Sequence, residues 1–169
     1  EAIAASFAEV EMYASKQLVA KIGGRYEYNS LSLQSTVDPR ISLAYKPSKK
    51  GQFSFAYGNF RQSPKNQYLR NNNQLASEQA EHYILNYQII NDRKTFRIEG
   101  YYKRYSDLVK FTNGDPFLLT NSGKGYAKGI ELFWRDSQTI KNVDYWFSYS
   151  YLDTKRDYLN YPSAAVPTF

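Results

Sequence analysis

Apolar and polar residues alternate one by one along much of this chain. From Ile41 to Lys46, one face of an extended segment would carry isoleucine, leucine and tyrosine, and the other would carry serine, alanine and lysine. Residues 53–58 and 145–151 repeat the pattern, except that Trp146 falls among the small residues. A period of two is that of a β-strand, whereas a helix repeats about every 3.6 residues. The pattern therefore predicts strands with one apolar and one polar face.

The breaks between these segments alternate in length. Short turns are predicted near residues 15–16, 48–51, 91–93 and 137–139, and longer polar stretches at 29–38, 61–75 and 107–124, with a fourth beginning near Lys155. Strands joined in this way pair as antiparallel hairpins, with the short turns at one end of the sheet and the long loops at the other. About eight strands result, at residues 4–13, 17–28, 39–47, 51–60, 76–90, 94–106, 124–136 and 142–153.

The length of these strands narrows the fold class. About ten to twelve residues reach about 33–40 Å, and a tilt of about 45° matches that length to an apolar band about 25 Å tall. Strands of globular proteins are most often about five or six residues long. The pattern predicts an all-β fold, a long antiparallel meander of about eight strands that forms an arc of a transmembrane β-barrel. A closed eight-stranded barrel is the alternative.

Aromatic residues make up 17% of the 169 residues, and 17 of them are tyrosines. Tyrosine and tryptophan favour a membrane–water interface, because the ring is apolar while its polar tip reaches water. Most aromatics at strand ends fall on the apolar face, which we assign to lipid; the interface candidates are Tyr28, Tyr45, Tyr57, Trp134, Tyr145 and Tyr151. The polar face would line an aqueous lumen or contact a plug, and there Glu9 and Glu11 could pair with Lys21 and Arg25. The competing interpretation is a soluble sandwich whose core the rings fill.

Several classes of chemistry are excluded or disfavoured. The chain has no cysteine, so it can form neither disulfides nor a cysteine-based zinc or redox site. His82 is the only histidine, which rules out sites built on several histidines, and we interpret it as a polar residue facing the lumen. The formal charge is +6, but the basic residues are spread along the chain and do not single out nucleic acid. We predict no enzyme activity, no cofactor and no metal.

Binding is expected in the long loops, because exposed loops carry many of the ligand contacts of proteins. Rings stack on sugars, and amides and guanidinium groups bond to hydroxyls or carbonyls, so these loops suit a glycan or a siderophore. The candidate ligand-binding residues are Tyr68, Arg70 and Asn72 in the loop 61–75, Asp115 and Phe117 in the loop 107–124, and Arg156 and Tyr158 near the C-terminal end.

Five stretches carry a family resemblance: residues 38–45, 55–64, 80–83, 100–105 and 121–132. The last is the most specific, because a loop there returns into a strand through Gly125-Tyr126-Ala127-Lys128-Gly129-Ile130-Glu131. In their order and spacing these stretches resemble the barrel domain of TonB-dependent outer-membrane receptors, especially those of Bacteroidetes.

The resemblance implies a barrel of about 22 strands with a globular plug inside it. It implies import of a bulky nutrient, such as a siderophore, a cobalamin or a glycan, energised through a periplasmic TonB-type protein. The location would be the outer membrane of a Gram-negative bacterium, with the lipid bilayer and the protein's own plug as partners, and no nucleic acid. Residues 1–169 contain no plug and too few strands for closure, so we expect them to be an internal part of one β-barrel domain.

Two other functions stay open at this point. One is a complete small outer-membrane barrel of eight strands with an adhesion or structural role. The other is a soluble tyrosine-rich β-domain that binds single-stranded nucleic acid, because Lys103-Arg104-Tyr105 interleaves cations with a ring. These side chains would alternate across both faces of a strand and would not form one platform.

Overall fold

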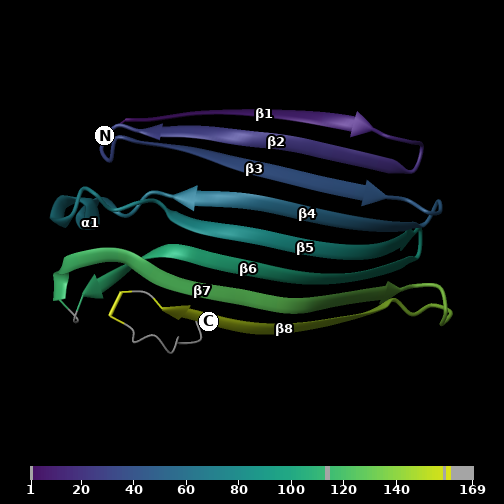
Figure 1. Cartoon of the computed structure of the whole chain (residues 1–169). Coiled ribbons are helices and arrows are strands. Elements are labelled where there is room, and N and C mark those ends of the chain that lie inside the picture. The colour runs from purple at the N-terminus through teal and green to yellow at the C-terminus, as the bar shows by residue number, and fades with distance from the viewer. Residues whose placement is uncertain (1, 113–114, 158, 161–169) are drawn as a thin grey trace.

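The computed structural model describes residues 2–112, 115–157 and 159–160, and they form one antiparallel sheet (Figure 1). The strands are β1 (Ile3–Tyr13), β2 (Leu18–Asn29), β3 (Gln34–Tyr45), β4 (Gly51–Gln62), β5 (Glu78–Asn91), β6 (Lys94–Thr112), β7 (Asp115–Asp136) and β8 (Tyr145–Asp157), with one short helix, α1 (Asn66–Asn71). Each strand pairs with its neighbours in chain order, so the predicted meander is confirmed. In the described residues β1 and β8 do not pair. The sheet is thus an open arc and not the closed eight-stranded barrel of the alternative.

The connections lie at two ends of the sheet (Figure 1). The turns after β1, β3, β5 and β7 lie together at one end, which we call the turn end, and α1 lies at the other, the loop end. This is the predicted arrangement. In the described part of the chain, no helix is long and apolar enough to cross a membrane.

The structure corrects three boundaries at the loop end. β3 begins at Gln34 and not near residue 39, and only four residues join it to β2. Most of the stretch 107–124 is strand and not loop, because β6 and β7 continue as a long hairpin with register shifts after Tyr105. Neither face of this extension carries a continuous apolar band. The alternation that predicts strands therefore ends there, although the backbone ladder continues. The helix α1 was not predicted either; its Leu69 is buried against the hairpin.

The apolar band crosses the strands obliquely. The ladders place Ala20, Leu43, Phe55, Leu85, Gly100, Ile130 and Tyr151 in one row across β2 to β8. On β8, Tyr151 is the last apolar residue of that face towards the loop end, whereas on β2 the last is Tyr28, eight residues beyond Ala20. Eight residues span about 26 Å and six strand spacings about 29 Å. The strands are therefore tilted by about 42° to the normal of the band, within the range of transmembrane barrels.

The turn between β7 and β8 is organised by Asp136, whose side chain is buried. Its carboxylate accepts hydrogen bonds from the backbone N–H groups of Gln138 at 2.8 Å and Thr139 at 2.9 Å, and from the Thr139 hydroxyl at 2.6 Å. Lys94 Nζ lies 3.0 Å away. The Thr139 hydroxyl, together with the two N–H groups and Lys94, holds the pKa of this carboxyl well below its usual range, against the opposing effect of burial.

This turn should make stability depend on pH. Because the folded pKa of Asp136 is depressed, its stabilisation is complete above the unfolded pKa of about 4 and is lost as the pH falls towards the folded pKa. The protein in detergent should therefore lose its stability advantage over Asp136→Asn as the pH falls below about 4, in urea unfolding at several pH values. Asp92→Asn, in the exposed β5–β6 turn, is the control. A wild-type advantage that stays constant from neutral to acid pH would contradict this account.

Candidate functional site

The two faces of the sheet differ in chemistry. The face that carries Leu43, Phe55 and Leu85 is the apolar face, and it exposes large hydrophobic side chains over all strands from β2 to β8. Leu85 in its centre is 60% exposed. A contiguous apolar surface that extends over seven neighbouring strands is typical of a protein region that contacts a membrane or another protein.

Aromatic rings form two belts on the apolar face. Nearer the loop end, the rings of Tyr57 and Tyr83 lie 5.1 Å apart and those of Tyr83 and Tyr102 lie 6.4 Å apart. We call these three the loop-side belt. Nearer the turn end, the rings of Phe53, Tyr87, Phe96 and Trp134 follow one another at 4.4, 6.4 and 5.9 Å. Aromatic rings gathered among aliphatic residues on one apolar face are typical of a bilayer-facing barrel surface.

All six aromatic residues predicted for the membrane interface lie on the apolar face. The strand pairings and the alternation along each strand place them there; they are Tyr28, Tyr45, Tyr57, Trp134, Tyr145 and Tyr151. Their depth in a bilayer stays a prediction.

The polar face carries the charged pairs. Lys21 Nζ lies 2.7 Å from Glu11 and 3.6 Å from Glu9, as the sequence predicted. Arg25 was expected to join them, but it binds Glu27 on its own strand at 2.7 Å. Residues two apart on a strand share a face, so this local pair competes with the pair across the ladder.

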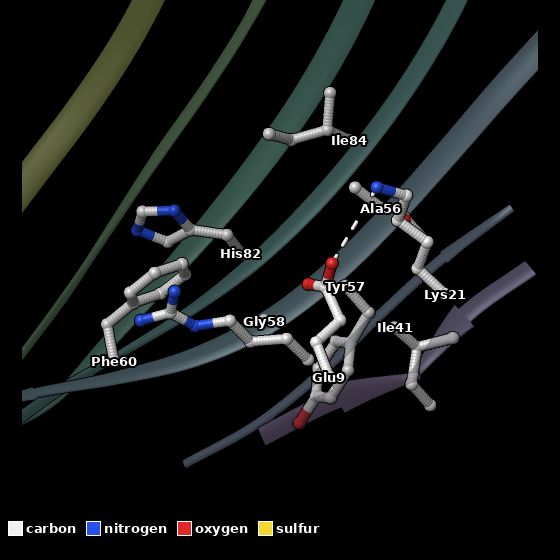
Figure 2. Close-up of a pocket in the computed structure, with 11 residues that line it drawn as sticks. Glu9, Lys21, Ile41, Ala56, Tyr57, Gly58, Phe60, His82 and Ile84 are labelled. Atoms are coloured by element: carbon white, nitrogen blue, oxygen red, sulfur yellow. Dashed lines mark ion pairs between the residues drawn. The ribbon is translucent and has the colours of Figure 1, made fainter. Parts of the chain in front are cut away.

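A hollow of about 220 Å³ lies on the polar face near β3, β4 and β5 (Figure 2). The Arg40 guanidinium carbon lies 4.6 Å from the centre of the Phe60 ring, and that ring lies 4.6 Å from the ring of His82. Figure 2 shows His82 beside Phe60 and Lys21 reaching towards Glu9. His82 therefore lies on the polar face, as the sequence predicted, with its ring tilted by 38° relative to that of Phe60. The described residues contain no cluster of three or more side chains suited to a metal ion.

A small hydrophobic core holds the loop end together. Leu69 of α1 and Leu75 after it pack with Val109 of β6 and Leu119 of β7, and all four are buried. The partly buried side chains of Tyr68, Phe111 and Leu159 pack against this cluster. The extension of the β6–β7 hairpin beyond Tyr105 and Gly125 comprises residues 106–112 and 115–124 in the described part of the chain. We call this extension together with residues 63–77 the cap.

Asn121 joins the two parts of the cap. Its side-chain oxygen accepts a hydrogen bond from the Ala76 N–H at 2.7 Å, and its amide nitrogen donates to the carbonyls of Ala76 at 3.0 Å and Asp107 at 2.8 Å. Asn72 adds a bond to the Leu119 carbonyl at 3.0 Å. The loop after β4 is thus tied by amide side chains to a hairpin that lies far away in the sequence.

Removing the Asn121 amide should loosen the cap. Asn121→Ala leaves backbone groups of Ala76 and Asp107 without partners, which costs about 1–3 kcal/mol. We expect limited proteolysis of the folded protein to cut residues 63–77 much faster in this variant. Asn73→Ala, at an exposed position of the same loop, should be cut at the wild-type rate. Equal rates for both variants would show that Asn121 does not hold the loop.

Two predicted ligand-binding residues meet at the cap. Tyr68 of α1 and Arg156 of β8 both line a hollow of about 150 Å³, together with Lys65 and Glu78. The Arg156 guanidinium carbon lies 4.2 Å from the centre of the Tyr105 ring, and its buried Nε has no hydrogen-bond partner in the described part of the chain. Sequence reasoning missed Glu78, and it could not place Lys65 of the loop 61–75 beside Arg156, because nothing local links these residues.

The other predicted ligand-binding residues are dispersed over the cap. Arg70 is exposed in the last turn of α1, and Phe117 is 71% exposed at the start of β7. The side-chain oxygens of Asn72 and Asp115 accept hydrogen bonds from nearby backbone N–H groups. Tyr158 lies outside the described residues. The structure thus brings Tyr68 and Arg156 together and leaves the others apart.

The fold and its two faces define the class of protein: an arc of a transmembrane β-barrel, with an apolar face banded by aromatics and a charged face opposite it. The sequence model of the TonB dependent receptor-like, beta-barrel family matches residues 2–169, and the chain belongs to this family. The resemblance found in the sequence is therefore confirmed at the level of the family. Comparison with curated proteins gives no match.

Solved structures show the same fold. The FrpB iron transporter from Neisseria meningitidis matches in its F5-1 variant, apoprotein form, with a TM-score of 0.75 and 13% identity over 98% of this chain and 27% of that one. Its F3-3 variant matches with 0.73 and 12% over 91% and 26%. The outer membrane transporter YddB from Escherichia coli matches with 0.72 and 14% over 91% and 25%. The chain thus spans about a quarter of the length of these structures.

Proposed function

We propose that this chain forms part of the barrel wall of an outer-membrane receptor that imports a bulky nutrient by energised transport. The nutrient would be a siderophore, a cobalamin or a glycan, and the host a Gram-negative bacterium. The observation that carries the proposal is the division of the sheet into an apolar face with two aromatic belts and a charged face, in a chain of the receptor family. No catalytic function is part of this proposal.

The partners follow from the two faces. The apolar face would contact the lipid bilayer, since it exposes aromatic rings and aliphatic side chains that suit a hydrocarbon layer. The charged face would contact the plug of the receptor, which we place together with the remaining barrel strands outside residues 1–169. A TonB-type protein would then supply energy through the plug.

The ligand would be recognised at the hollow between Tyr68 and Arg156. Arg156 lies over the Tyr105 ring and lines the hollow, so its guanidinium group would donate hydrogen bonds to a bound oxygen atom. Lys65 adds a second cation and Tyr68 adds a ring. The hollow is small, so it would hold one carboxylate, hydroxamate or hydroxyl-bearing group of a larger ligand while the rest contacts the exposed cap.

The test is uptake by the intact receptor in its own bacterium. We would delete the gene, restore it as wild type or as Arg156→Gln, and measure uptake of labelled ferric siderophores, cobalamin and oligosaccharides with and without the proton-motive force. One ligand should enter only with the receptor and only when the membrane is energised. Arg156→Gln should reduce that uptake about tenfold, the effect of about 1.4 kcal/mol. The matched variant Arg93→Gln, which removes an exposed cation at the turn end, should retain most of the uptake.

The outcomes separate the two parts of this proposal. Receptor-dependent uptake that persists without the proton-motive force would contradict energised import. Uptake of none of the ligand classes would contradict the transport function itself. Normal uptake by Arg156→Gln would remove the hollow from the ligand path and leave the transport function standing.

A further inference from the structure

A third hollow lies on the apolar side of the sheet, and its lining residues include three cations and one carboxylate, that of Asp157. It measures about 470 Å³, and its lining includes Arg104 of β6, Lys124 of β7 and Lys155 of β8. The ladder places Arg104, Tyr126 and Lys155 in one row across the three strands, and Lys124 lies two residues further towards the loop end. All three cations are exposed and surround Tyr126 on the same face.

This cationic cluster adjoins the loop-side aromatic belt. Tyr102, the last ring of that belt, also lines the hollow, and it precedes Arg104 by two residues on the same face of β6. Towards the turn end, the same face of β8 carries the aromatic residues Tyr151, Tyr149 and Phe147. Charged head groups of a bilayer lie directly beyond the layer that interface tyrosines occupy. The three cations are therefore at the level of lipid phosphates, if the apolar face contacts lipid as proposed above.

Nearby carboxylates do not neutralise the cluster. Asp157 is bound to Lys110 at 2.5 Å, and Asp153 is bound to Lys128 at 3.3 Å. Glu81 lies 3.8 Å from Arg104, whose side chain is 64% exposed, so this contact is weak. Lys124 and Lys155 have no carboxylate within ion-pair distance among the described residues. The hollow thus keeps an excess of positive charge.

We propose that Arg104, Lys124 and Lys155 bind the phosphate group of a lipid in the leaflet at the loop end. A guanidinium group matches two phosphate oxygens with a pair of parallel hydrogen bonds, and each ammonium group adds a point charge. The lipid chains would then run along the apolar face towards the turn end. The proposal rests on the outer-membrane location but not on transport, and it assigns a function to cations that the ligand hollow at Arg156 does not use.

Retention of phosphorylated lipid by the purified full-length receptor tests this site. The receptor in detergent is incubated with bis-phosphorylated lipid A, passed through a sizing column, and the retained lipid is quantified by mass spectrometry. The triple variant R104Q/K124Q/K155Q should retain about tenfold less lipid than the wild type. The triple variant K46Q/K49Q/K50Q removes the same charge from the exposed β3–β4 turn and should retain the wild-type amount. Circular dichroism and resistance to sodium dodecyl sulfate verify that each variant is folded.

Two further arms identify what is bound. Dephosphorylated lipid A should be retained poorly by the wild type, and inorganic phosphate should displace the phosphorylated lipid only weakly. The proposal is overturned if R104Q/K124Q/K155Q retains lipid like the wild type, if both triple variants lose it equally, or if the phosphate-free lipid is retained as well. Full displacement by inorganic phosphate would overturn the lipid in favour of a free-anion site.

This result can be separated from the function proposed above. Membrane fractionation shows whether the receptor is in the outer membrane, and uptake shows whether it transports. A receptor outside the outer membrane would remove the basis of both proposals. A receptor that is located there and transports its nutrient, but retains lipid equally in all variants, would contradict only the lipid site.

Discussion

Leu85→Arg should be among the most damaging substitutions, with a loss of about 2–4 kcal/mol of folding free energy in a bilayer. Leu85 lies in the middle of the apolar face, in the row between Phe55 of β4 and Gly100 of β6, and it is largely exposed. An arginine there would place a charge in the hydrocarbon layer. Urea unfolding of the full-length receptor in vesicles measures the loss, and the amount of receptor in the outer membrane should fall with it.

The matched control is the next residue in the chain. Asn86 points to the polar face, where its amide donates a hydrogen bond to Glu99 at 3.3 Å. Asn86→Arg adds the same charge beside a carboxylate, so its effect should stay below about 1 kcal/mol. Equal losses for both variants would mean that the apolar face does not contact lipid. Tolerance of Leu85→Arg would mean the same.

Gly129→Val should cost about 3 kcal/mol for a steric reason. A side chain at Gly129 would meet the Tyr151 carbonyl of β8 and the hydroxyl end of the Tyr101 ring. The carbonyl belongs to the ladder and cannot move without breaking the pairing of β7 with β8. Thermal unfolding of the receptor in detergent should show a clear decrease in the midpoint.

Gly100→Val provides the comparison. Gly100 is paired with Ile130, one residue from Gly129, but it lies on the apolar face and a Cβ there would have no atom within 4 Å. A β-branched residue also suits a strand, so this variant should be as stable as the wild type or slightly more stable. If Gly100→Val destabilises as much as Gly129→Val, crowding beside Tyr101 is not the cause.

Most of the sheet could be predicted from the sequence, because the alternation of apolar and polar residues along each strand reflects the face on which each side chain lies. β4 is an example: Phe53, Phe55 and Tyr57 share one face, and the predicted start at residue 51 is the observed one. The same signal is absent beyond Tyr105, where the strands leave the apolar band and buried residues such as Val109 and Leu119 are few. The extended parts of β6 and β7 carry polar residues on both faces, so they were predicted as a loop.

The candidate site was harder to predict because its contacts are not local. Arg156 was selected from its residue type alone, but its neighbours Lys65 and Glu78 come from a different part of the chain. The short helix α1 has no strong signal of its own, since its N-cap residue Lys65 makes no capping hydrogen bond, and it depends on Leu69 packing under the hairpin. The hydrogen bonds of Asn121 to Ala76 are not local either, so only the structure shows them.

The oblique apolar band restricts what can join the free edges of the sheet. From β2 to β8 the band shifts by eight residues over six strand steps, which is about 1.3 residues per strand. A strand that pairs with the open edge of β8 must therefore carry its lipid-facing residues slightly nearer the turn end than β8 does. A partner of β1 must carry them nearer the loop end. A slip of one residue at either seam would turn every side chain of the new strand to the wrong face. A slip of two residues would keep the faces but move the apolar residues of the new strand by about 7 Å out of line with the band. Both kinds of slip would place polar side chains in the hydrocarbon layer, so the band favours one register at each seam.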